Sequence, residues 1–140
     1  MSGGPRDRTG PLPVVSHDQV VPPSLLAPIQ AFRWFIDYGG RPGSGWLNTT
    51  TRVNPSSRAR YSPYLCTPYV TVPSLMMVAP ADEMVHANPE VSRQAFDLLA
   101  GEKEWYDLEG GHFGLLYHPS ELFDEASTVQ AEFLTRQLLG

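Results

Sequence analysis

The stretch that decides the fold is an apolar run ending in an acid, SLMMVAPAD, at residues 74–82. Residues 72–79 have the length and apolar character of a strand buried on both faces of a parallel sheet. Asp82 follows this strand directly. After a helix and a second strand expected at residues 104–108, the turn at residues 109–114 presents His112. The order strand, helix, strand predicts two neighbouring parallel strands joined by a crossover helix.

Local end signals predict three helices around these strands. Asn88 is a typical N-cap residue, Pro89 suits the first helical position, and Gly101 is expected to end that helix. A last helix is expected at residues 120–139 and an early one at 24–38. The apolar residues that recur at helical spacing, and that we expect to be buried, are Leu25, Ile29, Phe32 and Ile36; Val91, Ala95, Leu98 and Leu99; and Leu122, Ala126, Val129 and Phe133.

The chain divides into three parts by composition. Residues 1–23 are rich in proline without an apolar period, which predicts a disordered or unpacked N-terminal segment. Residues 24–69 are expected to hold a helix and a long irregular connection, whose aperiodic stretch 41–68 is typical either of a lid or binding loop or of a displaced connecting loop. Residues 70–140 carry the strand and helix pattern. The predicted fold class is α/β.

Charge and cysteine content narrow the function classes. The chain has 15 acidic and 10 basic residues, a net charge of −5, and no basic cluster interleaved with aromatic residues, so a nucleic-acid surface is not expected. No apolar run reaches the roughly 18 residues of a membrane helix. One cysteine, Cys66, excludes an internal disulfide and agrees with a reducing compartment. With a polar N-terminus, unlike a signal peptide, a cytoplasmic location is expected.

Asp82 and His112 form the candidate site. Both follow predicted parallel strands, and the carboxyl ends of such strands lie at one edge of the sheet. An aspartate at this edge can accept the Nδ1–H of a histidine and stabilise the imidazolium that forms during proton transfer. Both residues also suit ordinary turns, so spacing alone leaves a structural role open.

Two motifs and the last helix give the chain a family resemblance. Residues 70–140 resemble the C-terminal segment of the α/β-hydrolase superfamily, nearest its dienelactone-hydrolase-like and serine-peptidase-like bacterial members. The resemblance rests on VPSLMMVAPADEMV at 72–85, LEGGHF at 108–113 and AEFL at 131–134. It implies that Asp82 is the acid and His112 the base of a Ser-His-Asp triad. It further implies a hydrolase that cleaves an ester, amide or similar acyl bond without a cofactor.

The nucleophile of such a triad is missing from the sequence. The G-x-S-x-G elbow and the oxyanion loop of the family are absent, and Gly43-Ser44-Gly45 lacks the required spacing. We therefore expect the chain to be inactive alone. Three interpretations stay open: a fragment of a hydrolase, a subunit completed by a partner chain, or a non-catalytic binding protein. An open apolar strand edge also predicts a second copy or a partner chain covering it.

The remaining candidates are weaker. Glu83 could replace Asp82 as the acid, although the aspartate occupies the family position. His86 is expected to be a partly exposed loop residue. His118 lies six residues after His112, a spacing that does not align two ligands on one helix face, so no metal site is expected. Cys66 lacks an activating neighbour and is interpreted as inert.

Overall fold

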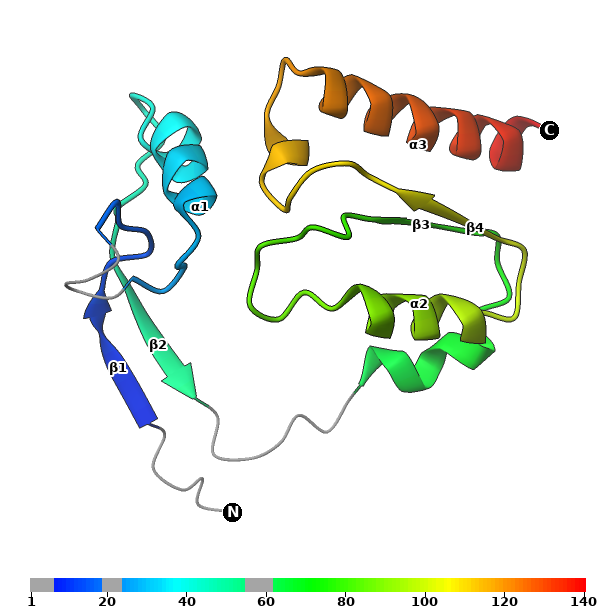
Figure 1. The fold of residues 1–140 in the computed structure, drawn as a ribbon, viewed down its shortest axis with the longest axis horizontal. Coiled ribbons are helices and arrows are strands. Elements are labelled where there is room, and N and C mark those ends of the chain that lie inside the picture. Colours follow the sequence, from blue (N-terminus) through cyan, green and yellow to red (C-terminus); the bar gives the residue numbers. More distant parts are fainter. Residues whose placement is uncertain (1–6, 19–23, 55–61) are drawn as a thin grey trace. The chain divides into compact units, whose positions relative to one another are not determined.

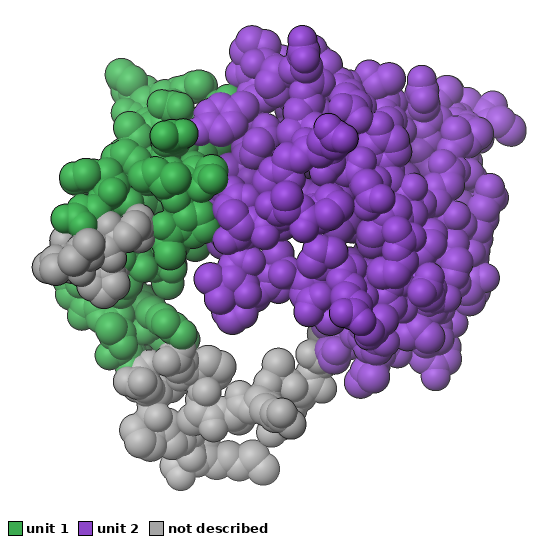
Figure 2. Space-filling model, viewed as in Figure 1, with its two compact units in different colours: residues 1–60 green, residues 61–140 purple. Residues whose placement is uncertain are grey.

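The computed structural model describes residues 7–18, 24–54 and 62–140. The chain divides into two compact units, residues 1–60 and residues 61–140, which Figure 2 colours separately. Among the described residues each unit holds a two-stranded sheet, antiparallel in the first unit and parallel in the second. The chain is therefore of mixed α/β class, with one parallel strand pair (Figure 1).

The first unit is built on strands β1 (Asp7–Leu12) and β2 (Thr50–Asn54), which pair antiparallel. Their register shifts within β1, where Gly10 has a φ of 149°. A Cβ at Gly10 would lie 2.9 Å from the carbonyl oxygen of Thr50. Because that backbone conformation and that close approach both exclude a side chain, the irregularity requires glycine.

A short helical segment and a buried valine complete the first unit. Helix α1 (Ile29–Trp34) continues into the π-helical turn η1 (Phe35–Gly39). The Asn48 side chain donates a hydrogen bond to the carbonyl of Val15 (2.9 Å) and accepts one from its N–H (3.0 Å). Val15 is fully buried, so this amide satisfies backbone groups that water does not reach.

Three predictions for the N-terminal half are wrong. The prediction of a disordered or unpacked segment over 1–23 is wrong for residues 7–18, which include β1; residues 1–6 and 19–23 lie outside the described residues. The aperiodic stretch 41–68 contains β2 and most of the 3₁₀ helix η2 (Pro63–Tyr69), which belongs to the second unit; residues 55–61 lie outside the described residues.

The third correction concerns where the first helix begins. It begins at Ile29 instead of Ser24, because the backbone just before it bonds to another segment of the chain. The N–H groups of Leu25 and Leu26 donate to carbonyls in the segment after β1, at 2.9 Å each. Pro28 is then the N-cap residue, with a φ of −59° and a ψ of 135°, the non-helical backbone that is typical of an N-cap.

The second unit has the predicted strand–helix–strand order. Strands β3 (Ser74–Val78) and β4 (Lys103–Asp107) pair in parallel over their whole length. Helix α2 (Pro89–Leu98) connects them, and the Asn88 side chain accepts two backbone N–H groups of its first turn. These contacts confirm Asn88 as the N-cap, although the helix ends before Gly101.

Two helices lie on opposite faces of the parallel pair (Figure 1). Trp105 of β4 packs against Phe96 of α2, with ring centroids 5.3 Å apart. The next residue, Tyr106, donates a 2.6 Å hydrogen bond to Glu125 of α3 (Glu121–Leu139). Because successive strand residues point to opposite faces, β4 contacts both helices.

Burial in this unit is lower than predicted. The five residues of β3 are each only half-buried, and β4 is the strand's sole sheet neighbour among the described residues. Val91 and Leu98 of the predicted α2 stripe are 47% and 41% exposed. The buried apolar residues of the unit are Leu108, Phe113, Ala126 and Phe133. The prediction of a fully buried strand is wrong because a two-stranded sheet leaves both of its edges open.

No helix among the described residues combines the length and apolar character that a membrane crossing requires.

Candidate active site

Asp82 lies in the turn that follows β3. Its backbone N–H donates to the carbonyl of Ala79 (3.1 Å), which closes the turn. Its Oδ1 accepts the backbone N–H of Met84 at 2.8 Å. A side chain that bonds the backbone two residues on is held in one orientation, as in other Asx turns. The second carboxylate oxygen is therefore aimed in a fixed direction.

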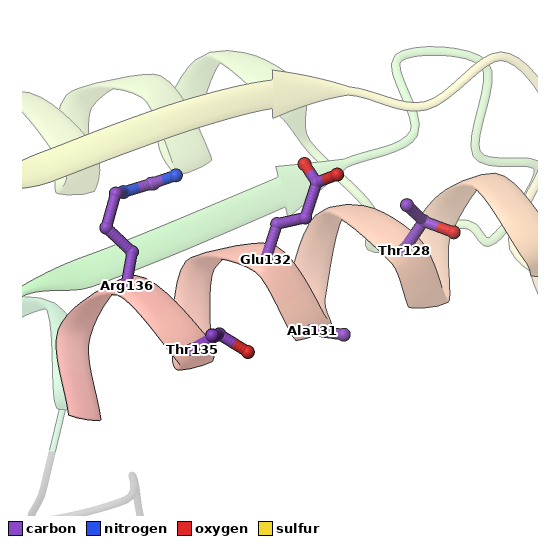
Figure 3. Close-up of a pocket in the computed structure, with 5 residues that line it drawn as sticks. All are labelled: Thr128, Ala131, Glu132, Thr135 and Arg136. Carbon is purple, nitrogen blue, oxygen red and sulfur yellow. The ribbon is translucent and has the colours of Figure 1, made fainter. Parts of the chain in front are cut away.

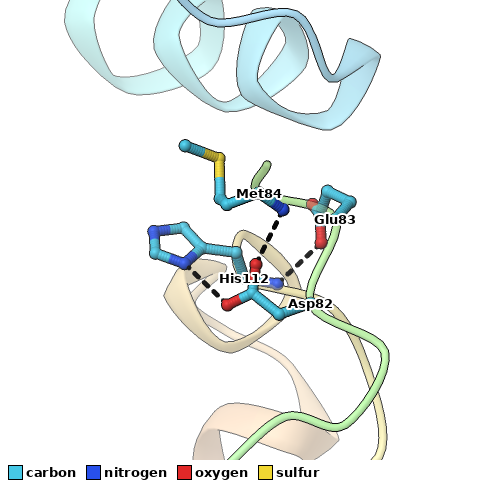
Figure 4. Close-up of polar contacts among 4 residues, drawn as sticks. All are labelled: Asp82, Glu83, Met84 and His112. Atoms are coloured by element: carbon cyan, nitrogen blue, oxygen red, sulfur yellow. Dashed lines mark hydrogen bonds and ion pairs between the residues drawn. The ribbon is translucent and has the colours of Figure 1, made fainter. Parts of the chain in front are cut away.

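His112 meets that second oxygen. Its Nδ1 lies 3.0 Å from Asp82 Oδ2, as Figure 4 shows. The Asp82 side chain is 18% exposed and the His112 side chain 46% exposed. An ionised carboxylate accepts only, so Nδ1 is the donor in this contact, and in the neutral form of the ring Nε2 is then the unprotonated nitrogen. The structure thus brings together the two residues that the sequence singles out.

Glycines shape the turn that carries His112. Gly110 has a φ of 133°, and a Cβ there would lie 2.8 Å from the Cδ2 of Leu122 in α3. The short 3₁₀ helix η3 (Gly114–Leu116) follows the turn. A residue with a side chain at position 110 would be strained and crowded, so the turn brings His112 to Asp82 only with glycine at that position.

Glu83 contacts His112 at a different atom from Asp82. Its Oε2 accepts the backbone N–H of His112 at 2.8 Å, whereas Asp82 takes the ring (Figure 4). Glu83 therefore does not replace Asp82 as the partner of the imidazole. Sequence analysis missed this backbone contact. Nothing in the residues around Glu83 indicates that its carboxylate accepts a backbone N–H 29 residues further along the chain.

Two hollows flank the pair, one on each face of the sheet. A cavity of about 250 Å³ beside His112 is bordered by α3 and is mainly apolar. Its apolar side chains are Met77, Ala79, Leu108, Leu115, Leu116 and Leu122. A second hollow of about 430 Å³ lies on the α2 side of Asp82 and is more polar. Asp82 lines both, and His112 lines the first.

The other candidate residues have different surroundings. His86 is exposed and borders the α2-side hollow. His118 packs against Phe123, with ring centroids 4.8 Å apart. Cys66 is exposed within η2. Ser44 belongs to the first unit, where its hydroxyl donates to the carbonyl of Gly39.

The described residues offer no metal site, and the remaining hollow is built from a single helix. The described part of the chain contains no group of three or more histidine, cysteine, aspartate or glutamate residues arranged to hold a metal ion. A shallow hollow of about 530 Å³ runs along α3 (Figure 3). Its lining residues are Thr128, Ala131, Glu132, Thr135 and Arg136. All five come from one helix, and the Arg136 guanidinium is already paired with the Glu104 carboxylate of β4, so the hollow carries no proposal.

Comparison of the chain with protein-family models, with curated protein sequences and with solved structures gives no significant match.

Proposed function

We propose that this chain carries the acid and the base of a serine hydrolase of the α/β-hydrolase type. In this proposal His112 is the general base, Asp82 orients it, and the substrate is an ester, amide or similar acyl compound. The observation that carries the proposal is the 3.0 Å contact between Asp82 Oδ2 and His112 Nδ1 at the carboxyl ends of two parallel strands. Catalytic groups of open α/β sheets gather at this edge.

The electrostatics of the pair suit a proton acceptor. The Asp82 side chain is 18% exposed and lies on the Nδ1 side of the ring, where a carboxylate stabilises the imidazolium that forms when Nε2 takes a proton. The Nε2 of His112 lies on the side of the ring away from Asp82 (Figure 4). A hydroxyl that approaches Nε2 meets a base whose other nitrogen is already held by a carboxylate.

The reaction would proceed in two acyl-transfer steps. His112 takes the proton of a serine hydroxyl as the serine oxygen bonds to the acyl carbon, and then gives that proton to the departing alcohol or amine. Water repeats the sequence on the acyl-enzyme and releases the acid. The apolar cavity of about 250 Å³ beside His112 would take the apolar part of such a substrate.

The serine of this mechanism would come from a polypeptide segment outside these 140 residues. The described polar contacts of His112 are with Asp82 and Glu83 and include no serine hydroxyl. The outer edge of β3 offers a place for that segment. Ser74 N–H and Val78 C=O bond toward β4, so the backbone groups of Leu75 and Met77 face the open edge. An added strand there would satisfy them.

Fluorophosphonate labelling of the 140-residue chain, analysed by intact mass, tests the proposal. We expect no adduct, because an unactivated serine reacts too slowly. A stoichiometric adduct that His112→Ala abolishes would place the nucleophile within this chain and overturn the external serine. An adduct that is equally strong in His112→Ala would remove His112 from the mechanism altogether.

A further inference from the structure

Glu83 makes a second contact with His112, through the backbone N–H of the histidine. The carboxylates of two consecutive residues, Asp82 and Glu83, reach the same histidine: one takes the ring Nδ1 at 3.0 Å and the other the backbone N–H at 2.8 Å. The contact with the ring fixes one distance only. It leaves the backbone of the histidine free to move within a turn that contains Gly110 and Gly111, the residues with the greatest conformational freedom.

The packing around Glu83 shows that this contact is specific. A Cβ at Gly111 would overlap the Glu83 carboxylate, so the turn leaves room for that group by having no side chain there. The other oxygen, Oε1, is buried and has no hydrogen-bond partner among the described residues. One oxygen of the carboxylate is thus desolvated without a partner, and the contact of the other oxygen with His112 offsets part of that cost.

We propose that Glu83 is a positioning residue for His112. It fixes the main chain at His112 so that Nδ1 stays on Asp82 and Nε2 stays directed outward, where a nucleophile would meet it. This inference rests on the proposed function, because it matters for catalysis only if His112 is the base. The contacts themselves exist independently of catalysis, so they can be tested in the chain as it is.

The experiment compares Glu83→Ala, Glu83→Gln and the wild-type chain by NMR. One readout is the hydrogen exchange of the His112 amide, and the other is the ¹⁵N signature that distinguishes the two tautomers of its ring. We expect Glu83→Ala to speed exchange at least about tenfold and to replace the single Nδ1–H tautomer with a mixture. Glu83→Gln retains an acceptor oxygen of the same reach and should keep both wild-type signatures.

Glu109 supplies the matched control. It is an exposed carboxylate in the same turn, so Glu109→Ala removes the same charge from the loop and should leave both signatures unchanged. If Glu83→Ala fails to fold, Glu83→Asp takes its place. It keeps the charge but withdraws the carboxylate by one methylene, and should give the fast exchange and mixed tautomers.

The outcomes separate this inference from the proposed function. A wild-type tautomer signature in Glu83→Ala, or in Glu83→Asp if that variant is used, would overturn the positioning role even if labelling later proves His112 catalytic. If both Glu83→Ala and Glu83→Gln lost the wild-type tautomer signature, the positioning role would also be overturned. The tautomer would then depend on the charge of Glu83 and not on its hydrogen bond to the His112 N–H. A hydrolase proposal that fails in labelling leaves these NMR results unaffected.

Discussion

Asp82 uses both of its oxygens, one on the His112 ring and one on the backbone N–H of Met84. The bond to the Met84 N–H determines which way the amide of an Asp82→Asn variant would face. An asparagine that keeps its oxygen on Met84 turns its NH₂ group toward His112, which would make Nδ1 an acceptor and move the ring proton to Nε2. The base would then be blocked with little change in geometry.

We therefore predict that Asp82→Asn lowers the turnover of the complete hydrolase by roughly 10³- to 10⁴-fold with only a small change in KM. Steady-state kinetics with an ester substrate measure this. Asp107→Asn is the matched control, because Asp107 ends the neighbouring strand and accepts from the Trp105 indole instead. Near-normal turnover in Asp82→Asn would show that Asp82 does not hold the base.

Tyr106 predicts a pH dependence of the folding stability that also depends on a single residue. Its hydrogen bond to Glu125 raises the tyrosine pKa above the ordinary 10.0, with smaller contributions from burial and from the glutamate charge. The folded state thus favours the neutral phenol. The resulting stabilisation is fully present below pH 10.0 and is lost as the pH rises through the higher pKa of the folded state.

Glu125→Ala removes both the hydrogen-bond acceptor and the charge, so it should lower the Tyr106 pKa toward 10.0. NMR titration of the Tyr106 ring carbons follows this one residue among the six tyrosines. A titration midpoint identical in the two proteins would refute the assigned cause. The Tyr106→Phe variant, which lacks the titrating group, confirms the assignment of the signal.

At the scale of elements, the turn between β4 and α3 depends on one glycine. Gly110→Ala places a side chain at a φ of 133° and 2.8 Å from Leu122 Cδ2. We predict a loss of about 1–3 kcal/mol in the free energy of unfolding, measured by urea denaturation. Gly114→Ala is the control, since its Cβ would meet the same Leu122 atom at an ordinary 3.4 Å and should change stability little.

The elements that sequence analysis predicted well are those with local signals. Helix α2 begins where Asn88 and Pro89 indicate, and α3 begins at Glu121 after the Ser120 cap, whose hydroxyl accepts the N–H of Phe123. Cap residues act on the N–H groups two or three positions on, so a short stretch of sequence contains both partners.

The elements that it missed depend on distant partners. Strand β1 pairs with a strand about forty residues away, and its proline and glycine residues conceal any alternation. The candidate pair Asp82 and His112 was predicted because strand ends share an edge of a sheet. The contact from Glu83 to a backbone N–H was not, since every residue except proline offers that donor and no side-chain pattern marks it.

At the scale of the whole molecule, several apolar side chains of the second unit are exposed. Val72, just before β3, is 64% exposed, and Leu138 near the end of α3 is 74% exposed. Unpaired strand edges with apolar flanks favour association with another chain. This is the physical basis for proposing that a further strand, and the serine with it, packs against β3.

We predict that the isolated 140-residue chain self-associates with rising concentration and that Val72→Lys weakens this association. A lysine beside an open edge is a known way to prevent strand pairing. Sedimentation velocity measures the effect. Leu47→Lys is the control, because Leu47 is 73% exposed in the first unit and acquires the same charge. Equal weakening by both variants would mean that net charge, not the β3 edge, governs association.

The most direct test of the central claim is fluorophosphonate labelling of the native protein. It would be isolated from its source with every polypeptide that contains or accompanies residues 1–140, and the labelled residue would be mapped by peptide mass spectrometry. We predict a single modified serine outside these 140 residues, whose labelling His112→Ala abolishes. A label that persists in His112→Ala, or no labelled serine on any accompanying polypeptide, would contradict the assignment of Asp82 and His112 as the acid and base of a serine hydrolase.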